Sequence, residues 1–247
     1  MNDWEIAMIA HKSEPVIYLE GDPGLPKGLR DLLVNILTKH LENTTNPHYI
    51  DLLNRLWDRS LRLAPNENIK VQHAKLCQQE VEHGVYNANI LSGLGVGPIN
   101  TPIQQYLLGM SIDTWVDLNF MHALGDRYGM YLGEVWENVP YEPLRRIAGR
   151  LHKEEVFHCN LGMSNLKNVC ATSDGKAEVQ ERLAVWWPAA LDMFGKSTSK
   201  LSAEYVKWGI RSKGNEELRQ EYIRDTRPIL EEMGLTVPDD RANRRFL

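Results

Sequence analysis

The sequence predicts an all-α protein: a four-helix bundle with additional helices. Three observations support this prediction. Apolar residues recur three and four positions apart in most segments between the Gly- and Pro-rich breaks. No segment has the alternating apolar and polar pattern of a half-buried strand. Residues 80–83 and 155–158 both read Glu-x-x-His, which places a carboxylate and an imidazole one turn apart on the same face of a helix.

Residues 1–27 are expected to form an extended arm. Three Pro and two Gly residues between positions 15 and 26 interrupt any long helix there. We expect such an arm to pack over the rest of the chain or to reach a neighbouring subunit. Residues 28–247 are then expected to form one ferritin-like helical domain, a length that suits one large globular unit.

Helical periodicity defines eight helices within this domain. Pro47 is expected to stop the first of them, because it cannot donate a hydrogen bond and disfavours helical geometry in the residue before it. Residues 92–111 have no sustained period and are expected to be a loop with at most a short helix near 104–108. This loop is either the wall or gate of a pocket or a crossover between distant helices, and 172–175 form a turn. The expected helices are 28–43, 48–63, 66–91, 112–138, 143–168, 177–194, 202–210 and 215–233.

The surroundings of the two Glu-x-x-His segments decide their interpretation, because a single copy is usually a solvated helix face. The second copy continues an apolar stripe through Ala148 and Leu151, and the first follows Leu76 and Cys77 by one turn. A carboxylate on a core stripe is costly unless it is paired or binds a metal. Two such helices, with one carboxylate from each of two others, form the dinuclear iron or manganese site of ferritin-like bundles. We therefore expect a ferritin-like bundle that holds two metal ions.

The helix expected at 112–138 offers a further candidate ligand, Asp126. Its inner stripe contains Gly125 and Gly129, whose small size would let another helix approach closely. Periodicity alone favours a metal ligand and a capped or paired surface residue equally at Asp126.

Composition excludes several classes of function. A net charge of −5 and a pI near 5.9 argue against nucleic acid as a partner. No stretch approaches the roughly 18 apolar residues of a membrane span, so no membrane association is expected. The first residues lack the basic and apolar regions of a secretory signal, which predicts a cytoplasmic protein. The three cysteines form no CxxC pair and are expected to be reduced.

Several segments resemble a known family. The chain is similar to the catalytic A-type subunits of bacterial phenylacetyl-CoA epoxidases, which are ferritin-like di-iron oxygenases. The resemblance covers nearly the whole chain, and its longest segments are the Trp-Trp-Pro-Ala region and the stretch that ends at Pro-Asp near position 239. The matching segments lie within residues 74–86, 114–126, 153–158, 186–195 and 217–239.

The resemblance implies a set of iron ligands that are also the catalytic residues: Glu80, His83, Asp126, Glu155 and His158. In the family the first helix supplies one more Glu. Glu42 is the nearest candidate, but it falls off the apolar stripe, where His40 sits instead. The first-helix ligand is therefore Glu42, His40 or absent.

The resemblance also implies an activity. It is that of a di-iron monooxygenase subunit, which activates dioxygen to epoxidise or hydroxylate an aromatic or acyl-CoA thioester, as in phenylacetate catabolism. The expected cofactors are two iron ions, or alternatively manganese. Because the chain has no flavin or iron–sulfur motif, electrons are expected from a separate NAD(P)H-dependent reductase.

The expected assembly is a homo-oligomer or a hetero-oligomer with a sister ferritin-like subunit. The sequence ends soon after Pro238, without the long extension of the epoxidase family, so we expect that substrate and partner can differ from those of the family. Two alternative functions remain from the sequence. One is a di-metal oxidase or desaturase acting on another small molecule, and the other is a metal-free structural subunit of such a complex.

Overall fold

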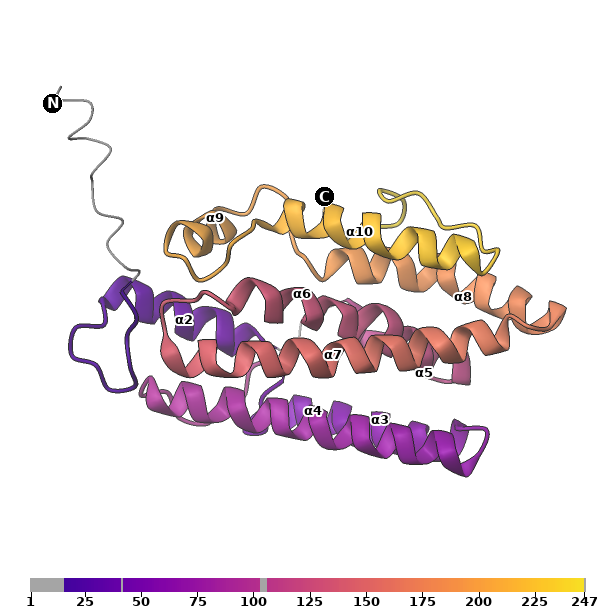
Figure 1. Ribbon diagram of the computed structural model, residues 1–247, viewed down its shortest axis with the longest axis horizontal. Helices are drawn as coiled ribbons and strands as arrows, with labels where there is room; N and C mark the ends of the chain where they lie inside the picture. The colour runs from indigo at the N-terminus through magenta and orange to yellow at the C-terminus, as the bar shows by residue number, and fades with distance from the viewer. Residues whose placement is uncertain (1–15, 41, 103–105, 247) are drawn as a thin grey trace, which may run out of the picture.

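The computed structural model describes residues 16–40, 42–102 and 106–246, apart from the side chain of Leu108. This part of the chain is all-α and ferritin-like, as predicted, and its only strand-like pairing is an isolated bridge between Tyr18 and Tyr141 (Figure 1). None of its helices is both long and apolar enough to cross a membrane. The helices are α2 (Lys27–Lys39), α3 (Pro47–Leu63), α4 (Glu67–Gly93), α5 (Trp115–Phe120), α6 (Arg127–Trp136), α7 (Glu142–Val169), α8 (Ser173–Asp192), α9 (Lys200–Lys207) and α10 (Asn215–Glu232), with a 3₁₀ turn η1 (Leu107–Gly109) and a π-helical segment η2 (Met121–Asp126).

The helices α2 and α3 together line one side of α4, and both run antiparallel to it. The side-chain contacts along this pair follow one order, so α2 meets the C-terminal half of α4 and α3 meets its N-terminal half. The contacts join Arg30 to Leu94, Leu37 to Asn87, Tyr49 to Glu80 and Ser60 to His73. The two helices thus occupy one position of the bundle, and the break between them lies beside the first Glu-x-x-His segment.

The break begins earlier than the sequence predicted. α2 ends at Lys39 and His40 is extended, with φ −64° and ψ 136°, whereas the helix was expected to continue to about residue 43. Asn43 explains part of the difference, because its side chain accepts hydrogen bonds from the backbone and the hydroxyl of Thr45 in place of helical bonds. Asn46 then caps α3. Leu41, predicted to lie on the apolar stripe, is outside the described residues.

The helix predicted at 112–138 is also interrupted. α5 starts at a Thr114 capping box, and a π-helical segment, η2, separates it from α6. α7 comes close to this segment at Gly162, where an added Cβ atom would lie 2.6 Å from the backbone nitrogen of Ala123. On the other side, the hydroxyl of Tyr222 in α10 donates to the carbonyl of Leu124 at 2.9 Å. Packing from two helices therefore supports a backbone geometry that nothing in the local sequence indicates.

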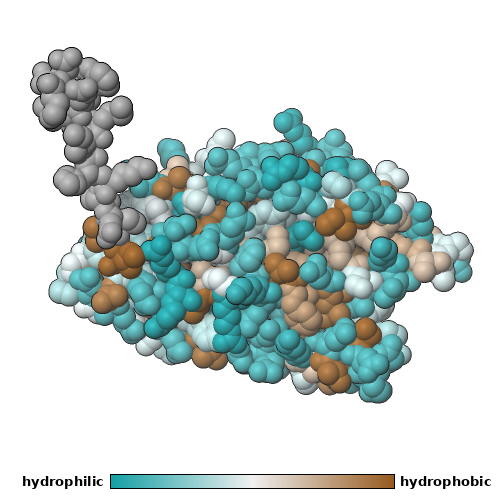
Figure 2. Space-filling view, viewed as in Figure 1, coloured by the Kyte–Doolittle hydropathy of each residue, from teal (hydrophilic) through white to brown (hydrophobic). Residues whose placement is uncertain are grey.

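α7 is the central helix of the bundle, packed between α4 and the α5–α6 pair (Figure 1). α6 approaches it closely at Gly133, where a Cβ atom would lie 2.8 Å from the backbone nitrogen of His152. α8 and α10 form a further layer whose buried face carries Trp186, Trp187 and Tyr222. The residues expected to form a turn at 172–175 are instead the cap and first turn of α8. Figure 2 shows a mostly hydrophilic face with scattered apolar residues.

Candidate metal centre

The structure brings all six predicted site residues together. Two groups of side chains have ligand atoms that lie within 4.8 Å of one another. Glu155 belongs to both groups and therefore lies between them. The first group is Glu80, Asp126, Glu155 and His158; the second is Glu42, His83 and Glu155.

Glu42 reaches the site because the first helix breaks. Its Oε2 lies 3.5 Å from Nδ1 of His83, and its backbone carbonyl accepts a hydrogen bond from Asn87 at 2.6 Å. His40 belongs to neither group, and its ring packs on Trp136 with the centroids 5.3 Å apart. Of the alternatives that the sequence left open, the geometry favours Glu42.

The carboxylate of Glu155 lies between two imidazoles. Its Oε1 is 3.4 Å from Nδ1 of His83, and its Oε2 is 3.5 Å from Nδ1 of His158. The same nitrogen of His158 is 3.1 Å from Glu80 and 3.8 Å from Asp126. None of these contacts has hydrogen-bond geometry at the two Nδ1 atoms or at Glu155 Oε2, so three buried polar atoms point into one space without a partner.

The outer nitrogens of both histidines are held in place. Nε2 of His83 lies 2.9 Å from the carboxylate of Glu154, and Arg150 donates to that carboxylate at 2.8 Å. Nε2 of His158 lies 3.1 Å from the side-chain oxygen of Gln79. These contacts turn both Nδ1 atoms toward the carboxylates, as the outer contacts of metal-binding histidines do.

Two carboxylates have supporting residues that were not predicted as part of the site. Nδ1 of His122 lies 2.7 Å from Asp126, and Tyr49 donates to the main-chain carbonyl of Glu80 at 2.7 Å. His122 lies one turn before Asp126 on the same helical segment, a spacing that a sequence search for carboxylate–histidine pairs would find. Tyr49 has no such signal, because it comes from another helix.

Charges of both signs are concentrated in this buried space. Burial raises the pKa values of Glu42 and Asp126 well above their usual range. Burial would also raise the pKa of Glu155, but its contacts with the two histidines outweigh that effect and lower the pKa to about 2. For His83, burial opposes protonation, yet the contacts with Glu154 and Glu155 raise its pKa to about 12. The carboxylates therefore demand positive charge in the space between them, and a metal ion would supply it in place of protons.

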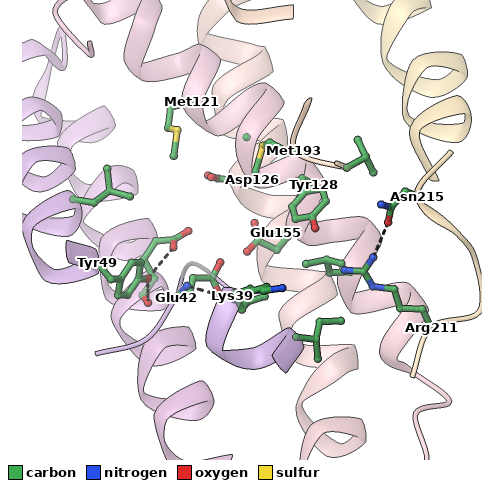
Figure 3. Close-up of a pocket in the computed structure, with 18 of the residues that line it drawn as sticks. Lys39, Glu42, Tyr49, Met121, Asp126, Tyr128, Glu155, Met193, Arg211 and Asn215 are labelled. Carbon is green, nitrogen blue, oxygen red and sulfur yellow. Dashed lines mark hydrogen bonds between the residues drawn. The ribbon is translucent and has the colours of Figure 1, made fainter. Parts of the chain in front are cut away.

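A cavity of about 210 Å³ reaches the candidate ligands (Figure 3). Glu42, Glu80, Asp126 and Glu155 line one part of it, and apolar and aromatic side chains line much of the rest. The described residues of the 92–111 loop do not line it. They instead cross the bundle, with Asn46 donating to the carbonyl of Thr101 at 2.9 Å, so the crossover interpretation of this loop is the one supported.

Comparison with known proteins identifies the family. The sequence pattern of the phenylacetic acid catabolic protein family matches residues 99–245, more than half of the chain. The chain belongs to this family. The match includes Asp126, Glu155 and His158, and the remaining three candidate ligands precede it.

A curated relative of this phenylacetic acid catabolic protein is the A-type subunit of 1,2-phenylacetyl-CoA epoxidase from Escherichia coli (strain K12). The two are 28% identical over 176 residues, which cover 66% of this chain and 56% of the relative. The aligned region thus spans little more than half the length of that protein. The resemblance to the epoxidase family that the sequence predicted is confirmed.

Proposed function

We propose that the protein is a di-iron monooxygenase subunit that uses dioxygen to epoxidise or hydroxylate an aromatic or acyl-CoA thioester. The observation that carries the proposal is the set of buried ligand atoms without partners: Nδ1 of His83, Nδ1 of His158 and Oε2 of Glu155. A buried polar atom without a partner costs free energy, and three that face one space are explained by ions that bind there.

The donor set fits iron. Four carboxylates and two imidazoles, shared through Glu155, would hold two ions: Glu42 and His83 on one side, Asp126 and His158 on the other, with Glu80 beside them. Bound iron would supply the electrons and the Lewis acidity for the activation of dioxygen. Manganese fits the same oxygen and nitrogen donors and is an alternative.

The chain's own residues position the substrate and keep water away. The cavity beside the carboxylates is lined by Met121, Leu132, Met193 and Phe194, which favour an apolar or aromatic group next to the site. Its volume of about 210 Å³ is below the range of about 300–1,000 Å³ that is typical for drug-sized ligands. The acyl part of a thioester can therefore enter, while the coenzyme would remain outside.

Electrons would come from a separate NAD(P)H-dependent reductase, since the sequence has no flavin or iron–sulfur motif. By its name, the epoxidase relative is one subunit of an assembly. We propose that this chain also works with other subunits, one of them a sister ferritin-like chain. The three cysteines, Cys77, Cys159 and Cys170, are free thiols, as predicted.

The test is a screen of aromatic acyl-CoA thioesters with iron-loaded protein, a chemical reductant and ¹⁸O₂, scored by mass spectrometry. The proposal expects one substrate to gain a single labelled oxygen atom. Glu155→Ala should abolish the product, while Glu67→Gln, which removes an exposed carboxylate from the same helix as Glu80, should leave it unchanged. Iron-loaded protein that oxidises a substrate without gain of labelled oxygen would favour an oxidase or desaturase, and a protein without metal would favour a structural subunit.

A further inference from the structure

Arg211 is a buried cation in the wall of the cavity. It lies between α9 and α10, and only 9% of the residue is exposed. Its Nη1 donates to the side-chain oxygen of Asn215 at 3.2 Å, its guanidinium lies 5.3 Å from the centre of the Tyr205 ring, and its Nε has no partner. Arg211, Asn215 and Tyr205 all line the cavity.

No carboxylate of the described residues lies within ion-pair distance of Arg211. Two other buried arginines show how this fold usually balances such a charge: Arg219 is paired with Glu216, and Arg244 with Asp192. Arg127 also lacks a carboxylate partner, but it does not line the cavity. Of these unpaired buried arginines, Arg211 is therefore the one that a ligand in the cavity can meet.

The charges of the cavity leave Arg211 without compensation. The only carboxylates among its described lining residues are the four candidate metal ligands, Glu42, Glu80, Asp126 and Glu155. In the proposed function these four negative charges balance two divalent ions. The positive charge of Arg211 then has no counterpart, and a buried charge without one is costly. A bound anion would remove this cost.

The shape of the cavity places such an anion on the side away from the metal ligands. In Figure 3, Glu42, Asp126 and Glu155 lie on one side, Arg211 and Asn215 lie on the other, and the ring of Tyr128 lies between them. Phe194 and Met193 also line the cavity. An aromatic ring can occupy this apolar middle part while a polar group attached to it reaches the guanidinium.

We propose that Arg211 binds the carboxylate of a small aromatic acid, and that the free acid rather than its CoA thioester is the substrate. This inference rests on the proposed oxygenase function and narrows its substrate class. A guanidinium matches a carboxylate through two parallel hydrogen bonds. Asn215, which holds Nη1, is the positioning residue of this subsite. The neutral carbonyl of a thioester would leave the charge of Arg211 unbalanced.

The test compares two ligands that have nearly the same shape but different charge, phenylacetate and phenylacetamide, by calorimetry on metal-loaded protein. The parent should bind phenylacetate at least roughly tenfold more tightly than the amide, and Arg211→Gln should lose that preference while binding of the amide stays the same. Arg211→Lys should keep part of the preference. Lys213→Gln serves as the matched control, because Lys213 lies in the same connection but pairs with Glu221 at 2.8 Å.

Several outcomes would overturn the inference. One is equal binding of the acid and the amide by the parent, a comparison that does not depend on whether the variants fold. Another is binding of phenylacetate by Arg211→Gln as tight as by the parent. A third is tight binding of phenylacetyl-CoA by a parent that does not bind phenylacetate. The metal content of each sample separates these results from failure of the proposed function, which would appear as a parent protein that takes up no metal.

Discussion

Gly129 lies directly against the carboxylate of Glu155. A Cβ atom added at Gly129 would lie 2.7 Å from Cδ and 2.8 Å from Oε1 of Glu155. α6 thus leaves room for the one carboxylate that belongs to both groups of candidate ligands. The sequence predicted that this glycine would allow close approach of a helix, and the structure confirms it. Gly125, predicted for the same role, faces the side chains of Leu107 and Met121 instead.

Gly129→Ala should therefore weaken metal binding without removal of any ligand. The new methyl group must displace the Glu155 carboxylate, and we expect the affinity for iron(II) to fall by roughly tenfold or more. The measurement is the iron content after dialysis against a weak chelator. Gly149→Ala in α7 is the control, because nothing lies within 4 Å of a Cβ atom there, and it should keep its iron. Equal iron retention in both variants would contradict the proposed position of Glu155.

A buried histidine outside the candidate ligand set should make stability depend on pH. Burial, with a smaller contribution from His122, lowers the pKa of His73 to about 3 from the ordinary value of 6.5. Between these values the unfolded chain binds a proton that the folded chain does not. Stability should therefore be unaffected above pH 6.5 and fall below it, by about 1.4 kcal/mol per pH unit for this residue.

The comparison is urea unfolding of the metal-free parent and of His73→Leu, from about pH 7 to about pH 5. His40 and His122, whose pKa values burial lowers to about 4, remain in both proteins and add to the slope of each. The variant should lose stability more slowly than the parent as the pH falls, by the contribution of one histidine. Parallel curves for the two proteins would show that His73 is protonated equally in the folded and unfolded states.

The three cysteines should differ in reactivity. Burial and the nearby Glu80 raise the pKa of Cys77 to about 12, and burial raises the pKa of Cys159 well above its usual range. Cys170 is only half-buried. Because the thiolate is the reactive form, iodoacetamide should label Cys170 first in the folded protein, as read by peptide mass spectrometry. Labelling of Cys77 or Cys159 at the rate of Cys170 would contradict the burial described here, and urea should make all three reactive.

The sequence revealed the parts of the site that depend on local spacing. Each Glu-x-x-His segment is visible because both of its ligands lie on one regular helix with an apolar stripe. Glu42 was ambiguous because its position depends on where α2 ends, and an Asn43 side chain rather than a change in periodicity decides that. The π-helical segment before Arg127 was missed because packing from α7 and α10, not local residue preference, supports it.

The cavity wall was beyond such reasoning for another reason. Arg211 and Asn215 lie far along the chain from every candidate ligand, in a segment with an ordinary helical pattern. Only the folded chain places them on the same cavity as Glu155. Likewise, Tyr49 meets Glu80 through contact between α3 and α4, which no spacing in the sequence indicates. The 1–27 arm and the 28–247 domain boundary stay predictions, since 1–15 lie outside the described residues.

The most direct test of the account is an anaerobic titration of metal-free protein with iron(II). The parent should bind two ions per chain, in two phases of unequal affinity, because Glu42 comes from an irregular segment and the other ligands from helices. Glu42→Ala should keep the ion at Asp126 and His158 and lose the other, His40→Ala should bind two, and Glu155→Ala should bind little of either. Two ions bound by Glu42→Ala with the affinities of the parent, or full occupancy in Glu155→Ala, would contradict the claim that these residues form one dinuclear centre.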